Sequence, residues 1–439
     1  MIYTKVMKRV SFWFLVIFLS LAMGYQIVTT WKGLDLAQKG TSKEALLKAI
    51  GIDSDNPLPF YKLGLLHQWS LLQGDIKDSD RYFQRAIEKN PFEQGCWLEL
   101  ARVFKARGEG QEFERALDNA ILIFPTGYRG RWVAGNLLLQ QGAIEKALPH
   151  FSYILTHYPN QSGLVYDVCG KVSNDPNFVL ENLVPRDPSA LKQYLSYLYD
   201  AGDKETAQIA WEKRATFGFK PDSGETLQHI DFLISKGEIN EAFRLWKVRL
   251  HEEGDLASSN GRLITNGGFE MEKNVGNGFD WKIAKVNGAE VSFDNSVSFE
   301  GKRSLKIAFN GRENVDFHQV GQVIALKPDT AYCLSAAMKT KGITTRSGVK
   351  IEIAGLDQAF YGASESLTGD NEWKTYQVTF KTPARSQGGQ VRVRRERTDK
   401  FDRLIAGEVW IDDVQLSEEP SRHETRSRAI IFVREREGR

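Results

Sequence analysis

The sequence has few of the residues that build redox, metal or nucleophilic sites. Of its 439 residues only three are cysteine and seven are histidine. Cys96, Cys169 and Cys333 lie far apart, without the spacing of a metal site or a disulfide framework, so we expect buried, unreactive thiols. No histidine has the spacing of a catalytic triad, and no phosphate-binding glycine loop occurs. We therefore expect a protein that is not an enzyme, with a facing pair of carboxylates as the alternative.

Excess charge of one sign is also missing. Lysine and arginine total 58 and the acidic residues 56, which gives a net charge of +2. A general attraction to nucleic acid does not follow from this balance. The content of 41% hydrophobic and 26% charged residues is ordinary for a folded chain, and the length favours about three domains.

Residues Val10 to Trp31 carry no charge. As a helix this run spans about 33 Å, enough for a bilayer core. Three basic residues lie before it, at positions 5, 8 and 9. The positive-inside rule then predicts a cytoplasmic tail (1–9), a transmembrane signal anchor (10–31) and a chain lying in the periplasm, outside the inner membrane. The alternative is a cleaved signal peptide, with its cleavage site at Ala22-Met23-Gly24.

A ladder of prolines follows the apolar run. Pro57, Pro91, Pro125 and Pro159 are each 34 residues apart. Proline fixes φ and lacks a donor, so it suits the break between helices. The period, with helical faces such as the one that starts at Trp97, resembles that of tetratricopeptide repeats.

The same register extends on both sides of the ladder. Counted backwards, it predicts a first helix at about 26–39 that continues the membrane helix directly. Counted forwards, it is irregular over 160–187 and then resumes in two degenerate hairpins. We therefore predict an α-solenoid over 32–253, whose concave surface binds a partner protein or peptide.

The chain changes character after a polar linker predicted at 254–261. Short segments with apolar residues at every second position alternate with turn residues such as Asn310-Gly311. They predict strands at 290–293, 304–309, 331–338, 349–353, 375–380, 390–394 and 408–416. The fold class is thus α plus β, with a C-terminal β-sandwich or jelly roll over 262–417. For the Arg- and Glu-rich tail (418–439) we expect disorder, with a terminal strand at 429–433 as the alternative.

Several motifs in this region resemble carbohydrate-binding modules of the family 4/9/22 type, which are galactose-binding-like jelly rolls. They include Asn266-Gly267-Gly268-Phe269-Glu270, Phe279-Asp280-Trp281, Gly301-Lys302-Arg303-Ser304-Leu305, Trp373-Lys374-Thr375-Tyr376 and Trp410-Ile411-Asp412-Asp413-Val414. The resemblance covers almost the whole β region. It implies a jelly roll that binds rather than cleaves glycans.

The resemblance also implies a structural calcium ion. Its candidate ligands are Glu270 and either Asp412 or Asp413, because neighbouring side chains of a strand point to opposite faces. The alternative is that these carboxylates accept backbone donors without a metal.

Sugar binding requires exposed aromatic rings with polar groups at the rim. Phe360 and Tyr361 lie in a predicted loop and form the best exposed pair, while Trp281 and His318 are further candidates with a structural role as the alternative for each.

A cationic run lies near the end of the predicted sandwich. Arg392 and Arg394 share one predicted strand face, and four more cations follow, at positions 395, 397, 400 and 403. Such a face suits an anionic glycan, through guanidinium–carboxylate contacts. The alternative is a solvated face that Glu396, Asp399 and Asp402 neutralise.

Taken together, the sequence predicts a membrane-anchored, non-catalytic scaffold in polysaccharide or envelope assembly. Its solenoid binds a protein and its jelly roll binds a glycan. A purely protein–protein adaptor, whose jelly roll has lost the sugar site, is the alternative. An enzyme accessory domain is a third reading.

Overall fold

The structure is a computed structural model that describes residues 2–69, 76–173, 175–254, 262–271 and 276–419. The chain forms two compact units, Met1–Phe217 and Gly218–Arg439. The predicted linker, apart from Gly254, and the tail beyond residue 419 lie outside the described residues.

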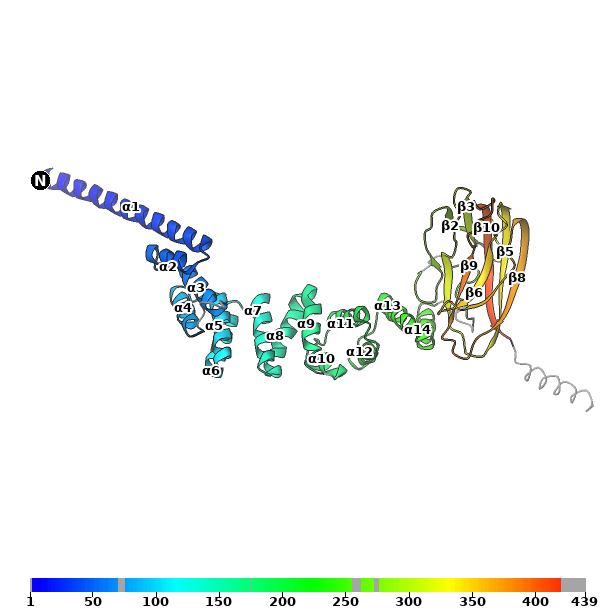
Figure 1. Ribbon diagram of the computed structural model, residues 1–439, viewed down its shortest axis with the longest axis horizontal. Coiled ribbons are helices and arrows are strands. Elements are labelled where there is room, and N and C mark those ends of the chain that lie inside the picture. The colour runs from blue at the N-terminus through cyan, green and yellow to red at the C-terminus, as the bar shows by residue number, and fades with distance from the viewer. Residues whose placement is uncertain (1, 70–75, 174, 255–261, 272–275, 420–439) are drawn as a thin grey trace, which may run out of the picture. The chain divides into compact units, whose positions relative to one another are not determined.

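The first helix, α1 (Ile2–Lys39), runs without a break through the predicted membrane boundary at residue 31 (Figure 1). Its segment Phe12–Lys39 is long and apolar enough to cross a membrane, and the apolar window within it is not buried. A signal sequence near an N-terminus has the same properties. The last turns of α1 pack against α2 (Lys43–Ile52) around the fully buried Ala37. The predicted continuity between the apolar helix and the first helical pair is therefore present.

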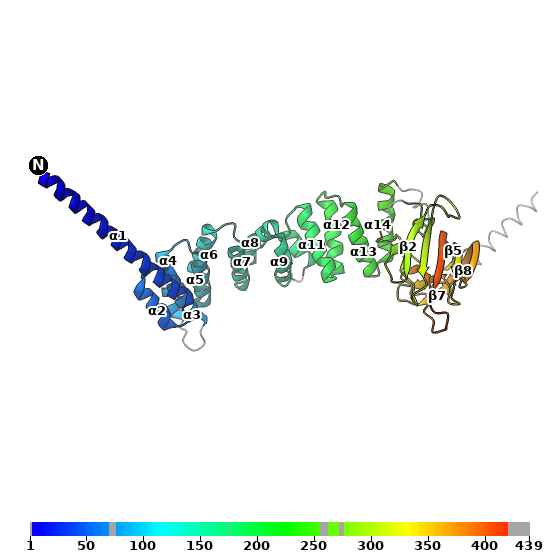
Figure 2. The same cartoon turned by 90° about the horizontal axis from the view of Figure 1, so that it is seen from above.

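The rest of the first unit consists of further helices, each packed against its neighbours (Figure 2). They are α3 (Pro57–Trp69), α4 (Ile76–Lys89), α5 (Gln94–Arg107), α6 (Gly110–Ile123), α7 (Tyr128–Gln140), α8 (Ile144–His157), η1 (Pro159–Gln161), α9 (Ser162–Cys169), α10 (Pro176–Asn182), α11 (Pro188–Ala201) and α12 (Lys204–Thr216).

The four prolines of the ladder lie where the sequence predicted breaks between helices. Pro57 begins α3, Pro91 and Pro125 lie in the turns before α5 and α7, and Pro159 begins η1. In two of the pairs, α3–α4 and α7–α8, the helices approach closely at glycine. A Cβ on Gly64 would come within 2.5 Å of the Phe83 ring, and one on Gly135 within 2.7 Å of the Phe151 ring.

The second unit begins with a helical hairpin, α13 (Ser223–Ser235) and α14 (Ile239–Glu252), and continues as a sandwich of two antiparallel sheets. Sheet A has the order β1-β4-β9-β6-β7 and sheet B the order β2-β3-β10-β5-β8. The strands are β1 (Lys282–Ile283), β2 (Ala289–Asp294), β3 (Ser304–Asn310), β4 (Val320–Ile324), β5 (Ala331–Ile343), β6 (Lys350–Gly355), β7 (Phe360–Ala363), β8 (Gly369–Lys381), β9 (Gly389–Arg394) and β10 (Ala406–Glu418).

All seven predicted strands are present, whereas β1, β4 and β7 were not predicted. The prediction of a loop at Phe360-Tyr361 is wrong, because these two residues begin β7. This is an edge strand with an irregular register to β6. The strand is short and contains Gly362, so its period-2 signal is weak.

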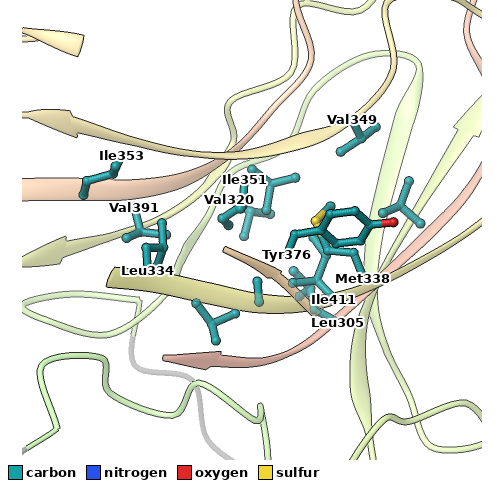
Figure 3. Close-up of a cluster of buried hydrophobic side chains, with 14 of the residues drawn as sticks. Leu305, Val320, Leu334, Met338, Val349, Ile351, Ile353, Tyr376, Val391 and Ile411 are labelled. Carbon is teal, nitrogen blue, oxygen red and sulfur yellow. The ribbon is translucent and has the colours of Figure 1, made fainter. Parts of the chain in front are cut away.

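The core between the sheets takes alternate side chains from each strand. Figure 3 shows part of it, including Val320, Ile351, Ile353 and Val391 from sheet A and Leu334 from sheet B. The neighbours of these residues on sheet A therefore point outward, away from the core.

The α13–α14 hairpin covers one end of the outer surface of sheet A. Val323 and Ala325, at the end of β4, join a second apolar cluster with Phe243 and Trp246 of α14. The Phe243 ring lies 5.0 Å from that of Phe279, and a hydrogen bond of 2.9 Å joins the Gly278 N–H to Asp231 of α13. The hairpin, assigned to the helical region by sequence, thus shares a core with the sandwich.

Two of the three cysteines are buried as expected. Burial raises the pKa of Cys96 and of Cys169 to about 12. Cys333 in β5 is only half-buried.

Candidate functional site

The outer surface of sheet A beyond the hairpin carries charged side chains from its central strands. Because Ile351, Ile353, Val391 and Val393 point into the core, the residues between them face outward. We call the set Lys350, Glu352, Gln358, Phe360, Arg392 and Arg394 the polar face.

Arg392 and Glu352 are direct neighbours in the register of β9 and β6. Arg392 donates from Nε and Nη2 to Glu352 Oε1, at 2.7 and 2.5 Å, and from Nη1 to Gln358 at 3.2 Å. The Glu352 side chain is 4% exposed and that of Arg392 19%. A charge pair this sheltered keeps a fixed geometry, since two planar groups hold each other.

Arg394 lies one pair further along β9 and is paired as well. Its Nη1 donates to Asp316 and to the Phe317 carbonyl oxygen. Partial burial pushes the pKa of the Asp316 carboxyl upward, but the hydrogen bond and charge of Arg394 more than offset this, so the pKa is lowered. Lys350 contacts Glu396 at 3.2 Å. The polar face therefore consists of matched charges and is not a free cationic surface.

His318 is exposed at the edge of this surface. It follows Phe317 in the chain, and the Phe317 carbonyl oxygen accepts a hydrogen bond from Arg394. The structure thus brings His318, Arg392 and Arg394 to one side of the sandwich.

The aromatic candidates separate into three different environments. Phe360 is 66% exposed and is the ring that a sugar can reach on this side. Tyr361 is half-buried and stacks on the core residue Phe380, with ring centroids 5.9 Å apart. Trp281 is 1% exposed and donates from Nε1 to the Asn266 carbonyl oxygen at 3.0 Å. The prediction that Trp281 stacks on a sugar is therefore wrong, because the ring is buried and neither of its faces is accessible.

The carboxylates predicted as calcium ligands lie away from the polar face, where the start of the module meets β10. Glu270 Oε1 accepts the N–H groups of Lys302 at 2.8 Å and Arg303 at 3.2 Å. Asp412 Oδ2 accepts those of Phe299 at 2.8 Å and Glu300 at 3.1 Å. Both acids thus hold the segment 299–303 between β2 and β3.

The backbone around these acids is tightly constrained. A Cβ on Gly267 would lie 2.0 Å from the Val414 carbonyl oxygen, so only glycine fits there. Asn266, Phe269 and Asp413 all have positive φ, between 44° and 57°. Strain of this kind persists only where the surrounding contacts determine the conformation. The segment 266–270 therefore packs against β10 in one fixed backbone conformation.

Asp412 and Asp413 differ in burial, and they lie where the register of β10 to β5 shifts and Asp413 has a positive φ. Asp412 is fully buried, and burial raises the pKa of its carboxyl. Asp413 is half-exposed and accepts a hydrogen bond from Gln415.

The backbone N–H contacts of Asp412 and Glu270 are those that the alternative without a metal predicts, and a buried carboxylate would also suit a hard cation. Asp412 is a buried carboxylate, and within the described residues only N–H groups neutralise it. Glu270 and Asp412 would hold the ion, which would supply charge compensation and a bond between the two ends of the module. Among the described residues no three His, Cys, Asp or Glu side chains gather in a metal-binding arrangement, so main-chain oxygens and water would complete the shell.

The sequence reasoning did not identify Glu352, Asp316 and Gln358 as part of this surface. A signal was present for Glu352: Lys350 and Glu352 alternate with Ile351 and Ile353 in a strand, which places two charges on one outward side. Asp316 and Gln358 lie in loops, whose position no local pattern reveals.

Comparisons with known proteins agree with this architecture. The family model "Carbohydrate binding domain" matches residues 261–400. A curated relative, the tRNA(Glu)-specific nuclease WapA of Bacillus subtilis subsp. natto, is 28% identical over 176 residues, which are 38% of this chain and 7% of WapA. The tRNA nuclease WapA of Bacillus subtilis strain 168 is 27% identical over a match of the same extent. The chain thus spans a small fraction of these relatives.

Among solved structures, one entitled "CBM4 structure and function" is 18% identical with a TM-score of 0.28, and covers 36% of this chain and 99% of its own. The CBM22-1 xylan-binding domain of Xyn10C from Paenibacillus barcinonensis is 14% identical with a TM-score of 0.23, and covers 32% of this chain and 86% of its own. The C-terminal sandwich of this chain therefore resembles a carbohydrate-binding module over residues 261–400.

Proposed function

We propose that the chain is a membrane-anchored, non-catalytic scaffold whose module binds a glycan through the polar face of sheet A. The observation that carries the glycan part is the carbohydrate-binding domain over residues 261–400, on which outward charged pairs lie beside one exposed ring. Planar, partly sheltered donors and acceptors such as Arg392, Glu352 and Gln358 suit the hydroxyl groups of a sugar.

The pairing of charges narrows the class of glycan. An isolated cationic face would favour a polyanion, but Arg392 and Arg394 each have a carboxylate partner. A polyanion would have to compete with Glu352 and Asp316 for these guanidinium groups. The polar face therefore suits a neutral or mixed-charge polysaccharide better than a strongly anionic one.

The anchor and the scaffold role are supported by the first unit. The apolar segment Phe12–Lys39 continues as one helix into the helical pairs. The anchor would place the module outside the inner membrane, where polysaccharides are assembled or exported. The helical pairs, with their proline ladder, suit the binding of a partner protein or peptide.

The purely protein–protein adaptor remains the second candidate. The observation that favours it is the single exposed ring, Phe360, on the polar face, because sugar sites usually present more aromatic surface.

A glycan array with the full chain, with and without calcium, separates these functions. We expect binding to a neutral or mixed-charge polysaccharide, lost in Arg392→Ala and kept in the matched control Lys381→Ala, an exposed cation of sheet B. Calcium is expected to increase the folded fraction rather than to contact the sugar. Absence of binding to any glycan, with the module folded, would favour the adaptor.

A further inference from the structure

The cationic run of the sequence divides into three parts in the structure. Arg392 and Arg394 belong to the polar face, and Arg395 points into the protein. The remaining cations lie in the loop between β9 and β10, residues 395–405. We call the exposed residues Arg397, Lys400, Phe401, Arg403 and Leu404 the basic tip.

A buried arginine holds this loop in place. Arg395 is 0% exposed and donates to Asn314 Oδ1 at 2.7 Å, and to the carbonyl oxygens of Val315 at 2.6 Å, Ser347 at 3.2 Å and Arg403 at 2.9 Å. One guanidinium group therefore ties together three loops at the same end of the sandwich. Burial lowers the pKa of Arg395, a cost that the carbonyl oxygens offset.

Further hydrogen bonds fix both arms of the loop. Asn314 Nδ2 donates to the Thr398 carbonyl oxygen at 3.0 Å, and Thr344 Oγ1 to that of Leu404 at 3.2 Å. The Arg346 N–H donates to Asp402 at 2.7 Å. The loop thus has a defined conformation up to its tip.

The held loop presents an apolar side chain with no neighbour. Phe401 has a relative exposure of 107%, the highest among the large hydrophobic residues of the described chain, and Leu404 is 46% exposed. A ring this exposed lies on a protrusion and not in a hollow. A small ligand needs a concave site, so the basic tip does not suit one.

The charges around Phe401 are left unpaired. Arg397, Lys400 and Arg403 are exposed, and the described residues place no carboxylate within salt-bridge distance of them. The acids of the same loop are partly engaged, since Glu396 contacts Lys350 and Asp402 accepts the Arg346 N–H. Asp399 is the remaining exposed acid of this loop, while the neighbouring loops add two exposed cations, Arg312 and Arg346, and one exposed acid, Glu313.

We propose that the basic tip docks the module onto a lipid surface with anionic headgroups. A protruding aromatic ring inserts at the interface between water and acyl chains, and cations beside it pair with phosphate groups. A sugar would need a rim around the ring, and a folded protein partner would need a matching hollow for one isolated phenyl group. A bilayer requires neither, because lipids rearrange around the inserted side chain.

The test uses the full chain in vesicles of phosphatidylcholine, with or without phosphatidylglycerol. Because α1 enters the vesicles by itself, the readout must be local. In a Cys333→Ser background, which removes the half-buried native thiol opposite Ser417, an environment-sensitive dye on Asp399→Cys reports the tip, and the same dye on Ser417→Cys, at the far end of β10, is the matched control. Contact is measured as quenching of the dye by lipids that carry a quencher.

We expect quenching at position 399 in anionic vesicles, little in neutral vesicles and none at position 417. Removing each of Arg397, Lys400 and Arg403 should weaken the tip–lipid association roughly fivefold. Phe401→Ser with Leu404→Ser should weaken it about tenfold or more. These exposed substitutions leave the core intact, and circular dichroism checks the fold.

Equal quenching at both positions, or quenching that survives Phe401→Ser with Leu404→Ser, would overturn the proposal. So would absence of quenching in anionic vesicles, including the case in which the tip instead captures a protein or a glycan. The outcome is independent of glycan binding by the polar face.

Discussion

The polar face and the basic tip come from one cationic run, yet the structure gives their charges opposite surroundings. Arg392 and Arg394 on the polar face each pair with a carboxylate, and their side chains are 19% and 17% exposed. Arg397, Lys400 and Arg403 at the basic tip are exposed and have no such partner within the described chain. A cluster of arginines therefore indicates a function only once the acids that face it are known.

Arg395 separates the two regions, and its removal should have the largest effect. Arg395→Met keeps much of the volume but leaves the Val315, Ser347 and Arg403 carbonyl oxygens without their donor. Each unsatisfied buried group costs about 1–3 kcal/mol, so we expect a loss of about 3–5 kcal/mol in the free energy of unfolding. Urea denaturation of the full chain measures it. The exposed neighbour Arg397→Met is the matched control, and an equal loss in both variants would contradict the role of Arg395.

Asp412 is the buried charge of opposite sign, and it allows a pH test. Its ordinary pKa of 3.8 is raised by burial. Because the folded state holds this proton more tightly than the unfolded state, the contribution of Asp412 to stability is fully present below its unfolded pKa and is lost as the pH rises through the folded pKa. Calcium should restore it at neutral pH, since the ion compensates the carboxylate.

Asp412→Asn should remove this contribution to the pH dependence together with the calcium effect, at a cost of about 2 kcal/mol from the weakened contacts to residues 299 and 300. Thermal unfolding between acid and neutral pH measures these effects. Asp413→Asn, half-exposed beside Asp412, is the control and should retain both. Calcium stabilisation that persists in Asp412→Asn would show that the ion binds elsewhere.

Glu352 tests whether the pairing on the polar face matters. Glu352→Gln removes the charge that holds the Arg392 guanidinium group and should cost about 1–2 kcal/mol of stability. It also frees Arg392, so binding should shift toward acidic glycans. Calorimetric titration with a neutral and an acidic polysaccharide checks this shift. An unchanged preference would mean that Arg392 does not contact the glycan.

The basic tip should give the smallest effect on stability. Phe401→Ser has no packing to lose, so the free energy of unfolding should change by less than about 0.5 kcal/mol. Glycan binding should not change either. A large destabilisation in urea would show that Phe401 packs against the protein.

The sequence predicted much of the architecture because the relevant signals were local. The proline ladder marked the helix junctions, and period-2 segments marked seven strands. Gly267 and Asp412 matched their motif because backbone packing and buried hydrogen bonds fix them. The helix junctions and strands depend on residues that are close in the sequence. Gly267 and Asp412 depend on positions that the surrounding backbone constrains.

The surfaces could not be predicted in the same way because they depend on distant pairs. Arg394 and Asp316 are 78 residues apart and meet only after the sheet has formed. Nothing local distinguishes buried Arg395 from exposed Arg397 two positions later. The contact of α14 with Val323 and Ala325 also joins segments that the sequence assigned to different domains.

The most direct test of the central claim is hydrogen–deuterium exchange on the full chain with and without a bound glycan from the array. We predict protection at Lys350–Gly355 in β6 and Gly389–Arg394 in β9, with no change at 396–405 or in sheet B. Protection confined to the basic tip or to sheet B, with β6 and β9 unchanged, would contradict the assignment of the glycan site to the polar face.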